Sequence, residues 1–312
     1  EDLLYAVPVP EQAGVSNTTV TMNAASMNNS GFEFSATYRN RDRDFKYELS
    51  ANLSTLRNRV TSLGFGTDSY ISGAYITNVG QEIGQFYGWA YEGIARTQED
   101  LDNHATQEGA RIGDCLYKDV SGPDGKPDGK IDANDQVVLG SGMPKIHFGF
   151  NARFEYKRFD LSIATFGALN YHVSDDIYNS LNSCYGWGNK EVGMLDANRF
   201  SEDGSTYLSN VPRTYVTNSA SLGWNDLFSS RKIQNAAYWK IANVELGYNF
   251  PNEWFGKYVS DVRFYVSAQN LHTFTGYHGY NVDYAGGTFT PGYSFCCYPT
   301  ARTFMCGVHC TF

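Results

Sequence analysis

Regular alternation of apolar and polar residues over stretches of ten or more positions is the feature that most restricts the fold of this chain. In FKYELSANLS, residues 45–54, the apolar row runs from Phe45 to Leu53, and the residues between its members are charged or polar. Successive side chains of a β-strand point to opposite faces, so this stretch predicts a strand with one apolar face. About eight such segments occur, among them 31–40, 146–156, 159–168, 238–250, 261–271 and 300–312.

The links between these segments differ in length in a regular way. Residues 41–44, 157–159 and 251–260 form short links, whereas the links over 55–145, 173–236 and 275–299 are long. Short turns on one side and long loops on the other are typical of bacterial outer-membrane barrels, whose tilted strands need about 9–11 residues to cross the bilayer. We therefore predict an all-β fold, an antiparallel transmembrane β-barrel with long extracellular loops. A soluble β-sandwich is the alternative, because its strands alternate as well.

Composition removes several classes of function. The formal charge of −9 and a pI near 5.1 argue against nucleic acid as a partner, because phosphates require a basic surface. No apolar run reaches the roughly 18 residues of a transmembrane helix. The chain contains no HExxH or GxSxG motif and no glycine-rich loop that would hold phosphates, so we expect no enzyme.

An aspartate-rich stretch, DGKPDGKIDAND (124–135), has the ligand spacing of a calcium loop. Asp124, Asp128, Asp132 and Asp135 would supply carboxylates, and Lys130 its carbonyl oxygen. Lys126 stands where a third early carboxylate is expected, and a second register would use Asp119 and Ser121 instead. The other interpretation is an aspartate- and glycine-rich turn without a metal, and the sequence leaves both open.

Residues 117–168 carry a recognisable series of motifs, YKDVSGPDGKPDGKIDANDQVVLGSGMPKIHFGFNARFEYKRFDLSIATFGA. This series resembles the SusC/RagA family of TonB-dependent outer-membrane transporters, in which a GDGxIDxxD element precedes PK, GFN and FDLS motifs. Residues 29–64, 238–251, 264–280 and the YPTARTF ending near the C-terminus are similar to the same family, in the same order. The resemblance covers the chain from about residue 29 to residue 312.

The resemblance implies a barrel of the 22-stranded, plugged type. Residues 1–312 would be the C-terminal portion of its barrel, with the plug domain and the N-terminal strands outside this chain. It also implies import of oligosaccharides across the bacterial outer membrane, together with a SusD-like surface lipoprotein and with energy from the TonB–ExbB–ExbD complex acting on the plug. Import of peptides is an alternative within the family. A complete eight-stranded outer-membrane barrel used for adhesion is a further alternative.

Three groups of side chains are candidates for function. In the family and in similar barrels a C-terminal aromatic residue is read by the barrel assembly machinery, and Phe312 matches it; it would also face lipid. Aromatic residues of the long loops are candidates for stacking on sugar rings, or alternatively for packing within the loops or an interface girdle: Tyr70, Tyr75, Tyr185, Trp187, Trp224, Tyr277 and Tyr280. The polar faces of the strands would line a permeation path or contact the plug, or their side chains would simply solvate one another inside the barrel; they carry Arg39, Lys46, Glu48, His147, Arg153, Glu155, Arg263 and Gln269.

Overall fold

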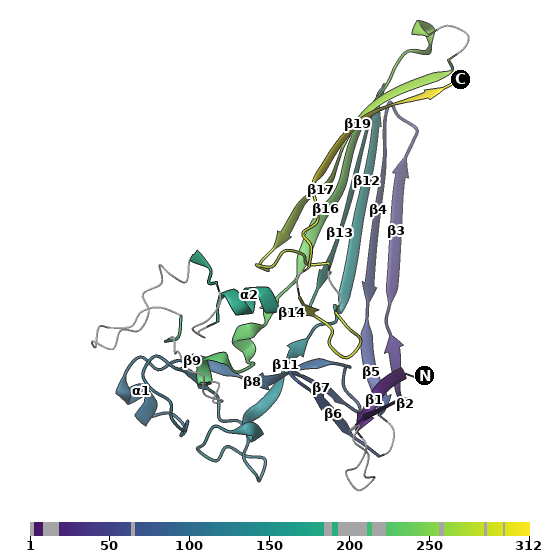
Figure 1. The fold of residues 1–312 in the computed structure, drawn as a ribbon. Helices are drawn as coiled ribbons and strands as arrows, with labels where there is room; N and C mark the ends of the chain where they lie inside the picture. Colours follow the sequence, from purple (N-terminus) through teal and green to yellow (C-terminus); the bar gives the residue numbers. More distant parts are fainter. Residues whose placement is uncertain are drawn as a thin grey trace.

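A seven-stranded antiparallel sheet is the main element of the computed structural model (Figure 1). The structure describes residues 3–8, 19–63, 66–183, 189–192, 211–213, 223–255, 259–283, 286–295 and 297–312. In spatial order the sheet contains β19 (Thr303–Thr311), β17 (Asp261–Thr275), β16 (Tyr238–Asn249), β13 (Phe159–Leu169), β12 (Ile146–Tyr156), β4 (Phe45–Thr55) and β3 (Glu33–Asn40).

The main sheet is open, and the prediction of one part of a larger barrel does not require it to close. The main sheet has seven strands rather than the predicted eight or so, and β3 and β19 are its two open edges. Within the described residues the sheet therefore does not close into a barrel. Each strand of the main sheet follows one of the alternating segments.

Alternation gives the sheet two different faces. β12 pairs with β13 without a break from Ile146↔Leu169 to Tyr156↔Phe159, so one row after another keeps its apolar residues on the same side. Phe34, Phe150 and Phe264 of this apolar face are 65%, 41% and 40% exposed. A β-sandwich would bury these side chains against a second sheet. In the part of the chain that the structure describes they are uncovered, which disfavours the sandwich.

The connections lie as the sequence predicts. The described residues of the short links 41–44, 157–158 and 250–260 lie at one end of the sheet, together with the C-terminus (Figure 1). The described residues of the long connections 56–145, 170–237 and 276–302 lie at the other end. We refer to these as the turn end and the loop end.

Two irregularities shift the alternation near the loop end. The register changes between Ala164 and Thr165 where β13 pairs with β16, and between Ile241 and Asn243 where β16 pairs with β17. Asn270 has a φ of 52°, in the left-handed region that asparagine tolerates better than most residues. Such bulges rotate the strand, and beyond them β17 continues to Thr275, past the predicted end at residue 271.

Smaller elements build the loop end. Its strands are β1 (Leu3–Pro8), β2 (Thr19–Ser30), β5 (Arg57–Ser62), β6 (Ser69–Ser72), β7 (Tyr75–Asn78), β8 (Gln85–Trp89), β9 (Tyr91–Ile94), β10 (Cys115–Tyr117), β11 (Gln136–Ser141), β14 (His172–Asp175), β15 (Gln234–Asn235) and β18 (Tyr293–Ser294). The helices are α1 (Gln98–Asp102) and α2 (Asp176–Leu181), and the 3-10 turns are η2 (Ala133–Asp135), η3 (Trp224–Asp226), η4 (Ser230–Lys232) and, at the turn end, η5 (Asn252–Trp254).

Most of the buried apolar residues belong to the loop end. One cluster joins Cys115, Tyr117 and Ile131, and another joins Ala25, Val60, Leu63 and Ile83. The loop end is thus a folded unit with cores of its own. None of the helices among the described residues is long and apolar enough to cross a membrane.

Candidate functional site

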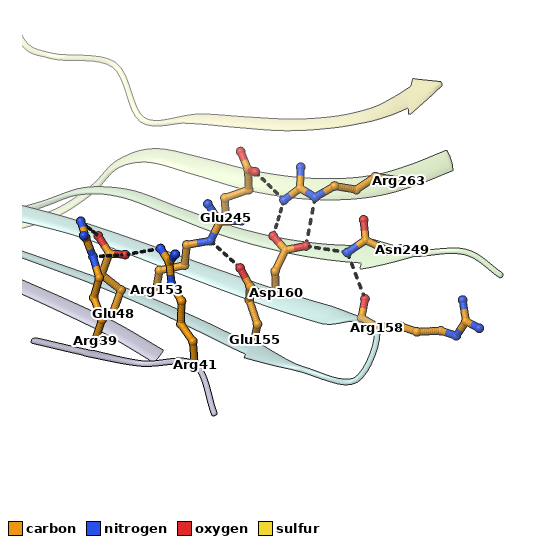
Figure 2. Close-up of polar contacts among 10 residues, drawn as sticks. All are labelled: Arg39, Arg41, Glu48, Arg153, Glu155, Arg158, Asp160, Glu245, Asn249 and Arg263. Carbon is orange, nitrogen blue, oxygen red and sulfur yellow. Dashed lines mark hydrogen bonds and ion pairs between the residues drawn. The ribbon is translucent and has the colours of Figure 1, made fainter. Parts of the chain in front are cut away.

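Charged side chains gather on the polar face of the sheet at its turn end (Figure 2). Arg39 of β3 and Glu48 of β4 are cross-strand partners, with 2.8 Å between Nε and Oε2. Arg41, from the adjoining turn, reaches the same Oε2 atom at 3.4 Å. Arg153 and Glu155, two positions apart on β12, approach to 3.0 Å. All of these residues except Arg41 were predicted to be on this face.

A second cluster spans three strands. Arg263 of β17 directs its guanidinium across β16 toward Asp160 of β13, with 3.0 Å between Nε and Oδ1. Its Nη2 also lies 2.7 Å from Glu245 Oε1 on β16 (Figure 2). Gly247 permits this crossing, because a Cβ atom there would lie 2.5 Å from both Arg263 Nε and Asp160 Oδ1. The sequence predicted Arg263 here, but its two carboxylate partners were missed.

The charges of these ion pairs cancel on the polar face of the sheet, which we call the sheet wall. Arg39, Arg41, Arg153 and Arg263 are balanced by Glu48, Glu155, Asp160 and Glu245, so the ion-paired set carries no net charge. Lys46 and His147 lie exposed on the same face, as predicted, and so does Gln269. A face of mixed and mutually paired charge does not favour permeants of one sign.

Near the loop end the polar face of the sheet is covered by other side chains and is shielded from solvent. Tyr238 of β16 is buried against Tyr171, Tyr277 and Val282 in an apolar cluster. Tyr171 donates its hydroxyl hydrogen to the Val282 carbonyl at 2.9 Å. The connection that follows β17 is therefore held across the polar face of the sheet by this hydrogen bond.

Two buried polar contacts strengthen this cover. Lys240, with a side chain only 4% exposed, lies 2.6 Å from Asp283. The hydroxyl of Tyr277 donates to the Asp175 carboxylate, and burial, followed by this hydrogen bond, raises the pKa of Tyr277. The phenol therefore stays protonated and remains a donor at neutral pH. Strand alternation alone did not reveal these partners, because Asp175 and Asp283 lie outside the alternating segments.

A hollow of about 990 Å³ lies among the three long connections. The β6–β7 hairpin, α2 and the segment around β18 contribute to it, with Ser72, Asn179 and Thr290 as hydrogen-bonding groups. Tyr293 and Phe295 add aromatic rings that are 37% and 59% exposed. Its lining is thus a mixture of hydroxyl, amide, ring and aliphatic surfaces together with the charged residues Asp176, Asp226 and Lys232, which suits a polar ligand with apolar faces.

The loop aromatics predicted to stack on sugars have different environments. Tyr75 lines the hollow, and burial raises its pKa, but Tyr277 is buried in the inner cluster. Tyr70 packs edge-on against Phe289, and Trp224 donates its indole N–H to the Glu108 carbonyl. Tyr280 is 61% exposed. Tyr185 and Trp187 lie outside the described residues.

Asp135 holds the aspartate-rich loop together through its own hydrogen bonds. It is fully buried, and its carboxylate accepts the backbone N–H groups of Val120, Ser121 and Asp132 at 2.9, 3.1 and 2.8 Å. Asp132 in turn accepts the N–H of Asn134 and caps η2. Both carboxylates therefore serve the fold of the loop.

The remaining predicted calcium ligands do not join them. Asp128 accepts the N–H of Lys130 at 3.0 Å, and Asp124 is exposed in the preceding turn. Asp119, from the alternative register, accepts from Gly129 with one oxygen, while its other oxygen is buried without a hydrogen bond. Over the described ranges no three His, Cys, Asp or Glu side chains converge on one point. Calcium binding stays a prediction.

The chain is similar in sequence to several TonB-dependent receptors. No family model matches the chain. TonB-dependent receptor P3 of Formosa agariphila is 30% identical over 331 residues, covering 100% of the chain and 31% of the relative. TonB-dependent receptor SusC of Bacteroides thetaiotaomicron is 25% identical over 319 residues, covering 100% and 29%. The chain thus spans about a third of the length of these relatives.

Solved structures agree with the fold. A structure described as the RagAB peptide transporter has a TM-score of 0.75 at 22% identity, over 98% of this chain and 31% of the other. The RagAB peptide importer in its open-open state gives 0.74 at 23%, over 100% and 31%. At these identities the likeness concerns the fold alone.

The antiparallel sheet has an uncovered apolar face and a charged opposite face, with short connections at one end and long connections at the other. These features define a segment of an outer-membrane transport protein. The chain belongs to the SusC/RagA family of TonB-dependent receptors, of which it is a partial segment. Such receptors reside in the bacterial outer membrane and are not enzymes, and both predictions are confirmed.

Proposed function

We propose that residues 1–312 form the C-terminal portion of a 22-stranded importer barrel, with the apolar face of the main sheet against lipid. The unbroken pairing of β12 and β13 supports this most directly, because each strand has 11 residues. At about 3.3 Å per residue and a tilt of about 45°, such a strand spans roughly 25 Å, the height of the apolar band of these barrels.

The open edges of the sheet agree with a larger ring. β3 and β19 each carry a row of backbone groups that face no other described strand, and further strands of the receptor would pair there. A complete eight-stranded adhesion barrel would instead need β3 to meet β19. The charged polar face would then contact the plug through which TonB acts, and Phe312, 89% exposed, would serve the assembly machinery.

For the substrate we favour oligosaccharides delivered by a SusD-like lipoprotein. The observation behind this choice is the hollow at the loop end, where hydroxyl and amide groups accompany Tyr293 and Phe295. Peptides are the second candidate, favoured by the fold likeness to the RagAB peptide importer.

Binding measurements on the purified receptor with its lipoprotein can separate the two. We expect oligosaccharide binding to weaken at least fivefold in Tyr293→Ala and Phe295→Ala receptors, because stacking contributes about 1 kcal/mol or more. Tyr298→Ala is the matched control, since Tyr298 is 87% exposed and does not line the hollow. Peptide binding that is lost in the same variants, with no response to oligosaccharides, would overturn the glycan assignment.

A further inference from the structure

The hairpin between β12 and β13 turns through two basic residues, Lys157 and Arg158. Lys157 has a φ of 57°, in the left-handed region. Two-residue hairpins place asparagine or glycine at such positions, because other side chains raise the free energy of this conformation. A lysine held in an unfavourable conformation at an exposed site points to a role for its charge.

The side chains of Lys157 and Arg158 differ from the arginines of the polar face, because they are not engaged by a carboxylate in the described part of the chain and can bind an anion. The ammonium group of Lys157 lies 5.3 Å from the centre of the Tyr156 ring, and both residues are exposed. Arg158 uses its backbone carbonyl to accept the N–H of Asn249, but its guanidinium has no hydrogen bond or ion pair to a described residue. In Figure 2 it points away from the cluster of Asp160 and Arg263.

Aromatic rings continue from this turn along the apolar face. Tyr156 and Phe159 are cross-strand partners and are 47% and 54% exposed. The ring centre of Phe159 lies 4.8 Å from that of Tyr248, and the ring centre of Tyr248 lies 5.1 Å from that of Phe250. Rings in such a band occupy the level of the lipid head groups in outer-membrane barrels. The turn therefore presents two positive charges just beyond an apolar, ring-covered surface.

We propose that Lys157 and Arg158 bind the phosphate of an anionic phospholipid whose acyl chains lie along Tyr156 and Phe159. A guanidinium donates two parallel hydrogen bonds to a phosphate, and an ammonium adds a point charge. An anionic head group keeps its net charge, whereas choline offsets the phosphate with a cation of its own. This inference rests on the proposed function, because it requires the apolar face to lie in a bilayer.

The test uses the intact receptor reconstituted in phosphatidylcholine bilayers. Spin-labelled phosphatidylglycerol and spin-labelled phosphatidylcholine report the relative association of each lipid with the protein. We expect a preference for phosphatidylglycerol that falls about fivefold in Lys157→Asn and about fivefold in Arg158→Gln, the effect of one cation near an anionic lipid. Asparagine suits the turn at position 157, so folding is preserved.

Lys46→Gln is the matched control, since it removes a cation from the polar face of the neighbouring strand and should leave the preference unchanged. A wild-type receptor that inserts without preference would overturn this inference alone. So would a preference that survives in both turn variants or falls equally in the control. A receptor that does not insert would overturn the proposed membrane orientation as well.

Discussion

A methyl group added at Gly247 tests how the polar face holds its charges. In the wild-type protein the Arg263 guanidinium passes directly over this glycine to reach Asp160 and Glu245. The Cβ of alanine would lie 2.5 Å from Arg263 Nε and from Asp160 Oδ1, closer than van der Waals contact allows. One of these groups must therefore move, and moving either of them separates an ion pair.

The magnitude follows from the burial of the pair. The side chains of Arg263, Asp160 and Glu245 are 23%, 11% and 28% exposed, so they lie between surface pairs and fully buried ones. Surface pairs contribute about 0–1 kcal/mol, and breaking a buried pair costs about 3–5 kcal/mol. We expect Gly247→Ala to lower the free energy of unfolding by about 2 kcal/mol, with overpacking included.

Denaturant-induced unfolding of the reconstituted receptor, followed by tryptophan fluorescence, measures this change. In an Arg263→Gln background the same alanine should cost less than about 1 kcal/mol, because the Asp160 carboxylate is then free to rotate away. Gly93→Ala is the control, since no atom lies within 4 Å of its added Cβ, and it should stay within about 0.5 kcal/mol. Equal costs in both backgrounds would refute the steric and electrostatic reasoning.

Three further predictions address the membrane face, the loop end and the aspartate-rich loop. Cys306 and Cys310 are free and exposed on the apolar face, so in bilayers they should react with lipid-soluble maleimides and resist charged thiosulfonates; labelling by the charged reagent would contradict the orientation. Burial, followed by the nearby Lys145 charge, lowers the pKa of His172 below its ordinary value of about 6.5. The fold then favours neutral His172, so thermal stability should be full above pH 6.5 and fall as the pH drops below it; His172→Gln should reduce this dependence, and an unchanged profile would contradict it. If the loop binds calcium, the ion at 100 times its Kd should stabilise the protein by about 2.7 kcal/mol. Asp124→Asn should abolish this stabilisation while leaving the stability measured in chelator unchanged. The absence of any calcium effect on the wild-type protein would refute this prediction.

Strand positions in the main sheet were predictable because each strand carries its own signal. Residues 146–156 alternate throughout and residues 159–168 alternate as far as Ala164, and the observed β12 and β13 match these segments to within one residue. Alternation is a local property, and it survives wherever pairing stays in register. It fails to predict the end of β17, because the left-handed Asn270 and the register change opposite it alter which residues share a face.

The partners within the sites were less predictable, because they depend on register across several strands. Alternation places Arg263 and Glu245 on the polar face, but only the pairing of β13, β16 and β17 brings Asp160 within reach of Arg263. At the loop end Tyr171 contacts Val282, more than a hundred residues away, and neither lies in a periodic segment. In the aspartate-rich loop, ligand spacing did not reveal that Asp135 accepts hydrogen bonds from the backbone N–H groups of Val120 and Ser121.

The distribution of charge has a consequence for selectivity under the proposed function. The arginines of the sheet wall are paired with carboxylates. These ion pairs therefore add no net charge that would attract a charged permeant. Discrimination between neutral substrates needs hydrogen bonds and ring contacts, and the hollow at the loop end supplies both through Asn179, Tyr293 and Phe295. Because the three long connections build that hollow together, specificity should be transferred between receptors by exchanging these connections as a set. Exchange of the sheet alone should leave the substrate unchanged.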